Sequence, residues 1–121
     1  MESNSKKIFV VDDDSSIGDI LTMMLELEGF NVNAFSAGRD GIERAKKEKP
    51  DLVLLDYFLP GENAEDIIKN LRNNVGPDLP ILLMSASAQG EDIAKELDVN
   101  EFIAKPFQRE ILLSAIGRNI N

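Results

Sequence analysis

The chain has 121 residues, 43% of them hydrophobic, so it is long enough to bury one core and too short for two domains. Its net charge of −9, from 13 basic and 22 acidic residues with no basic cluster, argues against direct binding to nucleic acid or to an anionic membrane. It has no cysteine, which excludes disulfides and thiolate metal sites, and no histidine, which excludes serine–histidine triads, histidine metal ligands and a histidine phosphocarrier.

Short apolar runs alternate along the chain with segments of helical periodicity. The first run, residues 8–11, opens onto three aspartates and precedes a predicted helix that Gly29 is placed to end. The residues that share the apolar face of this helix are Ile17, Ile20, Leu21, Met24 and Leu25. The second run, residues 32–35, is followed by a second predicted helix between residues 37 and 47.

The second half of the chain repeats this alternation three more times. The third run, residues 52–55, leads to a helix that Asn63 can cap, and the fourth, residues 81–84, leads to a helix over residues 90–97. The buried stripe of the third helix is Ala64, Ile67, Ile68 and Leu71. The fifth run, residues 102–104, is followed by a last helix that carries Ile111, Leu112, Ala115 and Ile116.

This pattern predicts an α/β fold. Apolar runs bounded by turn signals are typical of strands buried on both faces, as in a parallel sheet. Strands that alternate with helices imply right-handed crossovers and a doubly wound (βα)5 domain of the flavodoxin-like type, with helices on both faces and strand order 2-1-3-4-5. We expect this domain to span residues 6–119, with residues 1–5 as a loose N-terminal segment.

Residues of types that can bind a metal or a phosphoryl group follow four of the five apolar runs, and only the second run ends blandly, at Ser36. Asp12 and Asp13 follow the first run, Asp56 the third, Ser85 the fourth and Lys105 the fifth. Ligands of open parallel sheets bind beyond the carboxyl ends of the strands, so we expect these residues to meet at one site. Three crowded carboxylates repel one another and favour a compensating cation, for which their hard oxygen ligands suggest Mg²⁺.

The same residues suit phosphoryl transfer. Asp56 is the best-placed nucleophile, because carboxylates form aspartyl-phosphate intermediates and a loop with Pro60 and Gly61 follows it. Ser85 can donate a hydrogen bond to a phosphoryl oxygen, and Lys105 can neutralise another.

Each of these residues also has a purely structural interpretation. Asp12 and Asp13 could merely cap the first helix, although Asp14 or Ser15 is better placed to do so. Asp56 could be a turn acid. Ser85 could be a turn serine, Lys105 an ordinary exposed lysine and Phe102 a core aromatic.

Four motifs in this order resemble the receiver domain of two-component response regulators, and the resemblance covers about residues 6–119. The motifs are Val10-Val11-Asp12-Asp13-Asp14, Leu54-Leu55-Asp56-Tyr57-Phe58-Leu59-Pro60-Gly61, Met84-Ser85-Ala86 and Phe102-Ile103-Ala104-Lys105-Pro106-Phe107. The resemblance implies phosphorelay signal transduction by a non-enzymatic switch that catalyses its own phosphorylation and slow dephosphorylation. It implies no organic cofactor.

The resemblance also assigns roles. Asp56 would accept a phosphoryl group from a phosphohistidine on a sensor histidine kinase or a histidine phosphotransfer protein. Asp13, Asp56 and the Phe58 carbonyl would bind Mg²⁺, with Mn²⁺ able to substitute, and Asp12 would act through a bound water. Lys105 and Ser85 would contact the phosphoryl group.

Activation would involve a coupled pair of residues. Ser85 would move toward the new phosphate while Phe102 swings inward, which would shift the population between two protein-interaction surfaces. The Lys105-Pro106 peptide would be cis.

The chain departs from the family pattern in four places. Ala64 stands where glycine is usual, and Asp98 stands where glycine commonly ends the fourth helix, so a left-handed turn there would be strained or absent. The interval from Ser85 to Phe102 is short, which predicts a reduced fourth helix. Phe58 replaces smaller or polar side chains and could shade the phosphoryl group from water, which predicts slow self-hydrolysis.

Other functions and contexts compete with this interpretation. A phosphohydrolase of the haloacid-dehalogenase type would need a second aspartate at position 58, and an inert interaction module would not need the full set of site residues. The chain could also be the receiver fragment of a larger regulator or hybrid kinase, although a start at Met1 favours a stand-alone receiver. Without an apolar signal-peptide core or a bilayer-spanning stretch, we expect a cytoplasmic protein.

Overall fold

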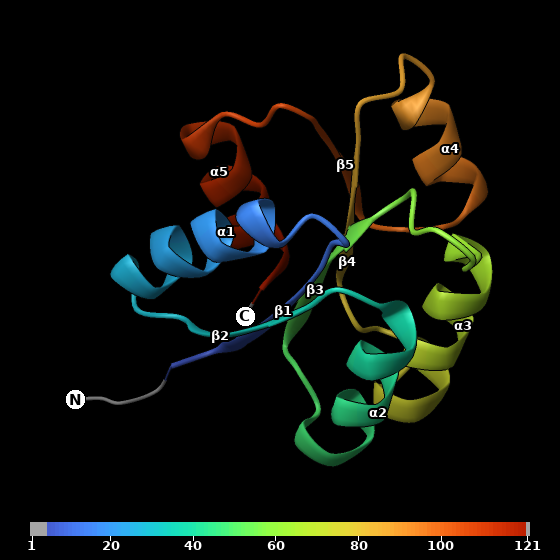
Figure 1. Ribbon diagram of the computed structural model, residues 1–121, viewed down its shortest axis with the longest axis horizontal. Helices are drawn as coiled ribbons and strands as arrows, with labels where there is room; N and C mark the ends of the chain where they lie inside the picture. The colour runs from blue at the N-terminus through green and yellow to red at the C-terminus, as the bar shows by residue number, and fades with distance from the viewer. Residues whose placement is uncertain (1–4, 121) are drawn as a thin grey trace.

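The computed structural model describes residues 5–120, in which five strands and five helices alternate (Figure 1). The strands are β1 (Lys7–Val11), β2 (Asn31–Phe35), β3 (Leu52–Asp56), β4 (Ile81–Ser85) and β5 (Glu101–Ala104). The helices are α1 (Ser15–Leu27), α2 (Gly38–Glu48), α3 (Ala64–Val75), α4 (Gly90–Glu96) and α5 (Arg109–Asn119). Most of the predicted loose segment, residues 1–4, lies outside the described residues.

The strands form one parallel sheet in the order β2-β1-β3-β4-β5, which confirms the predicted topology. Helices α1 and α5 cover one face of the sheet, and α2, α3 and α4 cover the other (Figure 1). Strands β1 and β3 are neighbours, but the chain after β1 crosses to β2 and the chain after β3 crosses to β4, in the opposite direction. At the carboxyl ends of these two strands the chain therefore leaves toward opposite faces of the sheet. This switch point leaves an opening there, in the place expected for a ligand site.

Each central strand contributes to two separate cores because successive side chains point to opposite faces of the sheet. In β3, Leu52 and Leu54 pack with the residues of α1 and α5, whereas Val53 and Leu55 pack with those of α2 and α3. All four are fully buried. The near-continuous apolar runs of the sequence therefore reflect burial on both faces, as predicted.

Two helices begin at the side chains predicted to cap them. The Asp14 side chain accepts a hydrogen bond of 2.9 Å from the Ser16 N–H at the start of α1. The Asn63 side chain accepts one of 3.1 Å from the Asp66 N–H at the start of α3. These bonds satisfy amides that a helix leaves without a partner.

The apolar face predicted for α1 is wrong at one position. Ile20 is 53% exposed, because the buried face of α1 is centred on Gly18, Leu21 and Leu25. Gly18 lies close to β2, where an added Cβ would be 3.5 Å from the Cβ of Ala34. A glycine contributes nothing to an apolar stripe, so the side-chain pattern misplaced the face. Ile111 is likewise 53% exposed, at the margin of the buried face of α5.

The fourth helix is short, with 7 residues, as the sequence predicted. Asp98, just after it, takes the left-handed conformation that glycine usually provides, with φ of 58°. The turn is therefore present without glycine, and aspartate tolerates this region better than most residues. The Arg72 guanidinium on α3 braces it by donating a hydrogen bond of 2.7 Å to the Asp98 carbonyl. Across residues 5–120, no helix is long and apolar enough to cross a membrane.

Replacing Leu54 with alanine is expected to lower the free energy of unfolding by about 3 kcal/mol, because Leu54 is fully buried at the centre of the sheet and its removal leaves a cavity. Urea denaturation would measure the loss. The matched control is Leu27→Ala, the same deletion at a side chain that is 81% exposed, where a change within about 0.5 kcal/mol is expected. Equal losses at both positions would contradict the described core.

Candidate functional site

The three predicted acids meet at the carboxyl ends of β1 and β3. Asp12 and Asp13 directly follow β1, Asp56 is the last residue of β3, and one carboxylate oxygen of each lies within 4.8 Å of the others. Asp12 is 2% exposed and Asp56 6%, whereas Asp13 is exposed. The arrangement is therefore two buried carboxylates beside one that faces solvent.

Asp12 is held by the chain on both of its carboxylate oxygens. One oxygen accepts a hydrogen bond of 2.9 Å from the Asp14 N–H, and the other accepts one of 2.8 Å from the Lys105 ammonium. Asp12 thus supports the turn that leads into α1, but Asp14 is the cap of that helix. A capping role alone leaves the contact with Lys105 unexplained.

Lys105 follows β5 and reaches across the sheet edge toward the two buried acids. Its ammonium lies 2.8 Å from Asp12 and 3.4 Å from Asp56, and the side chain is 20% exposed. Burial opposes the charged form most strongly, yet the hydrogen bond that Lys105 donates to Asp12 and the charges of both acids outweigh it and raise the pKa of Lys105. The lysine therefore stays charged. The Lys105-Pro106 peptide is cis.

Burial has the opposite consequence for Asp56. Burial and, to a smaller extent, the negative charge of Asp12 raise the pKa of this carboxyl, Lys105 and the Phe58 N–H offset part of the shift, and the net pKa is about 6. At neutral pH Asp56 is mostly ionised but poorly compensated. A cation or a phosphoryl group bound at the edge of the site would relieve this repulsion.

Ser85 ends β4, beside β3 in the sheet, and is 6% exposed. Its hydroxyl oxygen accepts a hydrogen bond of 3.0 Å from the Ser87 N–H, and its carbonyl accepts one of 2.9 Å from the Lys105 N–H. The hydroxyl is thus held at the same sheet edge as Asp56 and Lys105.

Phe102 lies on β5 opposite Leu83, two register positions before Ala104, which pairs with Ser85. Its ring packs on the first residue of α4, so closely that a Cβ added to Gly90 would lie 2.1 Å from two ring atoms. The structure therefore places the two predicted switch residues on adjacent strands and joins one of them to the fourth helix.

The loop between β3 and α3 carries the predicted carbonyl ligand, Phe58. It is anchored by a hydrogen bond of 2.9 Å from the Tyr57 N–H to the Met84 carbonyl and by Leu59, which is 4% exposed. The Phe58 side chain between these anchors is 76% exposed. The backbone of the loop is thus held while the phenyl ring faces outward.

One residue that contributes to the loop beside the site was not identified from the sequence. Glu62, in the same loop, accepts hydrogen bonds from the backbone amides of Gly38 and Arg39 at the start of α2. A weak signal did exist, because Ala37 before this helix has no side chain that can cap it. Sequence spacing could not show that the cap comes from 24 residues further along the chain.

Comparison with known proteins identifies relatives of the chain. The model of the response regulator receiver domain family matches residues 8–117. The DNA-binding response regulator MtrA of Mycobacterium tuberculosis is 34% identical over 118 residues, which cover 96% of this chain and 51% of that protein. The chain therefore spans about half the length of the curated relatives it matches.

Solved structures share the fold. The chemotaxis response regulator CheY4 of Vibrio cholerae superposes with a TM-score of 0.88 at 24% identity, over 97% of this chain and 100% of that chain. The receiver domain of the sensor histidine kinase PA1611 of Pseudomonas aeruginosa, with a magnesium ion coordinated in its active site cleft, gives 0.85 at 24% identity, over 95% and 97%. The BeF3-activated DrrB receiver domain gives 0.82 at 27% identity, over 94% and 96%.

The parallel sheet and the acidic site at its carboxyl edge define a signalling domain of the two-component type. The family match extends over nearly the whole described chain and agrees with this architecture. The chain belongs to the response regulator receiver domain family, as its motifs predicted, and it is a switch of phosphorelay signal transduction.

The Asp56→Asn variant is expected to be more stable than the wild type at pH 7 without metal, by about 2 to 3 kcal/mol. Because the folded-state pKa of Asp56 is raised from 3.8 to about 6, its ionisation costs stability as the pH rises through this window, and the cost is complete above the upper value. The difference should vanish below the lower value. Urea denaturation in EDTA at several pH values would measure it.

The control for this comparison is Asp19→Asn, which removes the same charge from an exposed residue of α1 and so separates the effect of net charge from that of burial. A stability difference between Asp56→Asn and the wild type that is constant with pH would contradict the raised pKa.

Proposed function

We propose that Asp56 is the phosphoacceptor of this receiver and that its donor is a phosphohistidine on a sensor histidine kinase or a histidine phosphotransfer protein. The observation that carries the proposal is the position of the buried Asp56 carboxylate, 3.4 Å from the Lys105 ammonium at the open edge of the sheet. A carboxylate oxygen of Asp56 attacks the phosphorus, the phosphorus–nitrogen bond breaks, and the imidazole leaves and takes up a proton.

The acids fit a divalent cation of the Mg²⁺ type. Their oxygens lie within 4.8 Å of one another, they are hard ligands, and two of the acids are buried with Lys105 as their one ion-pair partner among residues 5–120. We assign Asp13, Asp56 and the Phe58 carbonyl as direct ligands and Asp12 as a ligand through water, with Mn²⁺ able to substitute. The bound cation would neutralise charge on the phosphoryl oxygens. The magnesium ion reported for the PA1611 receiver domain supports this assignment.

The remaining residues of the site hold the phosphoryl group. The Lys105 ammonium lies between the two buried acids and is close enough to Asp56 to pair with a phosphoryl oxygen there. The Ser85 hydroxyl can donate a hydrogen bond to another oxygen. The receiver would thereby promote its own phosphorylation mainly by electrostatics and position.

We propose that Ser85 and Phe102 pass this event to the surface. Movement of Ser85 toward the phosphate would alter the packing of the neighbouring strand β5, on which Phe102 lies. Since the Phe102 ring packs on Gly90, a change in its position also changes the space available to α4. Phosphorylation would then bias two arrangements of the α4 and β5 surface. The downstream partner of this surface is a protein.

Two alternatives are less well supported. Burying two carboxylates beside a lysine costs free energy, because charged groups are removed from water, and an inert module would not need this arrangement. A phosphohydrolase of the haloacid-dehalogenase type would need a carboxylate at position 58, where the chain has phenylalanine.

The MtrA relatives are DNA-binding proteins about twice as long, so attachment to an output domain is a further context for this receiver.

Incubation of the chain with Mg²⁺ and acetyl phosphate is expected to add one phosphoryl group, which intact-mass measurement would detect. The Asp56→Asn variant should gain none, because it lacks the nucleophile, and EDTA should abolish the gain in the wild type. If acetyl phosphate fails, phosphorylated histidine kinases are the next donors. Failure with these donors as well would favour the inert module.

Replacing Phe58 with asparagine is expected to speed loss of the phosphoryl group about tenfold, equivalent to about 1.4 kcal/mol in the barrier. The exposed phenyl ring belongs to the residue two positions after the acceptor and would shade the phosphoryl group from water, whereas an amide can orient water. The decay of the phosphorylated mass after removal of the donor would give the rate. Phe58→Leu, which keeps an apolar side chain, is the control, and an unchanged rate in Phe58→Asn would refute the shading role.

A further inference from the structure

Helix α2 is capped by a side chain from another element. The residue before it, Ala37, makes no side-chain cap, and the Glu62 carboxylate takes its place from the loop between β3 and α3. One oxygen accepts a hydrogen bond of 2.7 Å from the Gly38 N–H, and the other accepts one of 3.0 Å from the Arg39 N–H. A carboxylate at this position also interacts favourably with the helix dipole.

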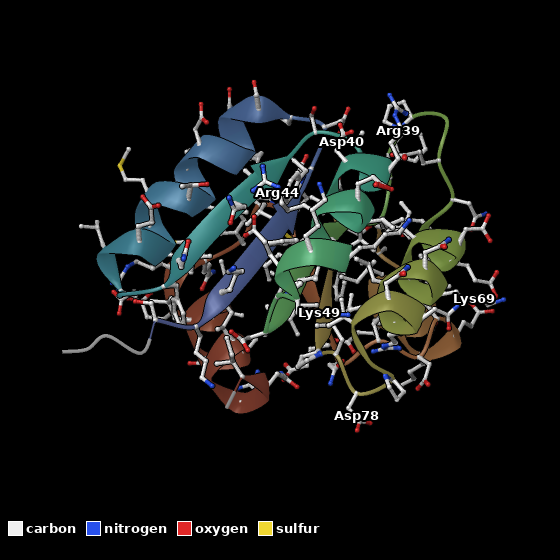
Figure 2. The ribbon with its side chains drawn as sticks, turned by 90° about the horizontal axis from the view of Figure 1, so that it is seen from below. Arg39, Asp40, Arg44, Lys49, Lys69 and Asp78 are labelled. Atoms are coloured by element: carbon white, nitrogen blue, oxygen red, sulfur yellow. The ribbon has the colours of Figure 1, made fainter. Side chains whose placement is uncertain are left out.

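The start of α2 is packed tightly against α3 and this loop. A Cβ added to Gly38 would lie 2.5 Å from Cδ1 of Ile67 and 3.3 Å from the Glu62 carboxylate, so glycine permits the close approach. Figure 2 shows Arg39 at the end of α2 next to the loop that leads into α3, and Lys49 at the opposite end of the helix. Glu62 therefore joins two elements that are already in contact.

The loop held by Glu62 is the one that carries the proposed carbonyl ligand. The Glu62 N–H donates a hydrogen bond of 3.0 Å to the Leu59 carbonyl, which closes a tight turn just after Phe58. On the other side of Phe58, the Tyr57 N–H bonds to β4. The exposed Phe58 side chain adds little restraint, so the position of its carbonyl depends on these two hydrogen bonds and on the buried Leu59 side chain.

We propose that Glu62 is a positioning residue for the metal site. By fixing the turn against α2, its carboxylate holds the Phe58 carbonyl in place relative to Asp56. The proposal rests on the proposed function, in which that carbonyl binds the divalent cation. Charge-assisted hydrogen bonds of this kind are stronger than neutral ones, and metal ligands depend strongly on the groups that orient them.

Titration of the metal-free protein with Mg²⁺ would test the proposal. Calorimetry gives the dissociation constant, and Tyr57, the single tyrosine of a chain without tryptophan, is a fluorescent probe beside Asp56. Glu62→Met keeps the length of the side chain but removes both acceptors, and it should raise the dissociation constant about tenfold. Glu62→Gln keeps one acceptor oxygen and should show a smaller increase.

The matched control is Glu65→Gln, which removes the same charge from an exposed residue three positions on, whose carboxylate pairs only with Lys69 at 3.5 Å among the described contacts. Its Mg²⁺ affinity should equal that of the wild type. If it weakens binding as much as Glu62→Met does, the effect is one of net charge and the positioning role is overturned.

Amide hydrogen exchange separates positioning of the loop from capping of the helix. The Gly38 and Arg39 amides should exchange faster in Glu62→Met than in the wild type, together with the loss of affinity. Faster exchange with an unchanged dissociation constant would overturn the proposal, because Glu62 would then serve α2 alone. A wild type that binds no Mg²⁺ would instead overturn the proposed metal site itself, and the positioning role with it.

Discussion

The burial of two like charges at the edge of the sheet is the constraint on which the site depends. Asp12 and Asp56 are almost completely buried, and the ammonium that lies between them belongs to Lys105, at the far end of the chain. Removal of charge from water is costly unless it is compensated, and one lysine cannot fully compensate three nearby acids. The unbalanced charge is what makes the site receptive to a cation and to an electrophilic phosphoryl group.

The parallel topology is what makes this crowding possible. Strands β1, β3, β4 and β5 run in the same direction, so their carboxyl ends deliver three aspartates, a serine and a lysine to one edge. The apolar side chains behind them fill two cores and hold the strand ends rigidly. A site that works by electrostatic preorganisation needs such support, because small displacements weaken every contact in it.

The elements around the site differ in how firmly they are held. The loop after β3 is tied to α2 by Glu62 and to β4 by its backbone, whereas α4 is short and begins where the Phe102 ring packs on Gly90. The far end of α4 is braced through Arg72 and the left-handed turn at Asp98. This arrangement suits the proposed switch, because it combines a firmly held loop, which would bind the metal, with a small helix whose first residue packs against the Phe102 ring.

The amino-acid sequence by itself determined the architecture and the composition of the site. Near-continuous apolar runs, helical segments between them and the caps at Asp14 and Asn63 are local signals, and each was predicted correctly from the chain. The meeting of Asp12, Asp13 and Asp56 followed from the strand order, which the alternation of elements implied. Local patterns suffice where each residue obeys the periodicity of its own element.

Only the tertiary structure decided the contacts between elements. Ile20 faces solvent because Gly18, which has no side chain to reveal its face, lies against β2. Asp98 keeps a left-handed turn because Arg72 reaches it from another helix. Glu62 caps α2 from a distant loop, and burial raises the pKa of Asp56. Each of these features depends on which groups three-dimensional packing brings together and how far it excludes water, and neither property is encoded in the spacing of residues along one strand or helix.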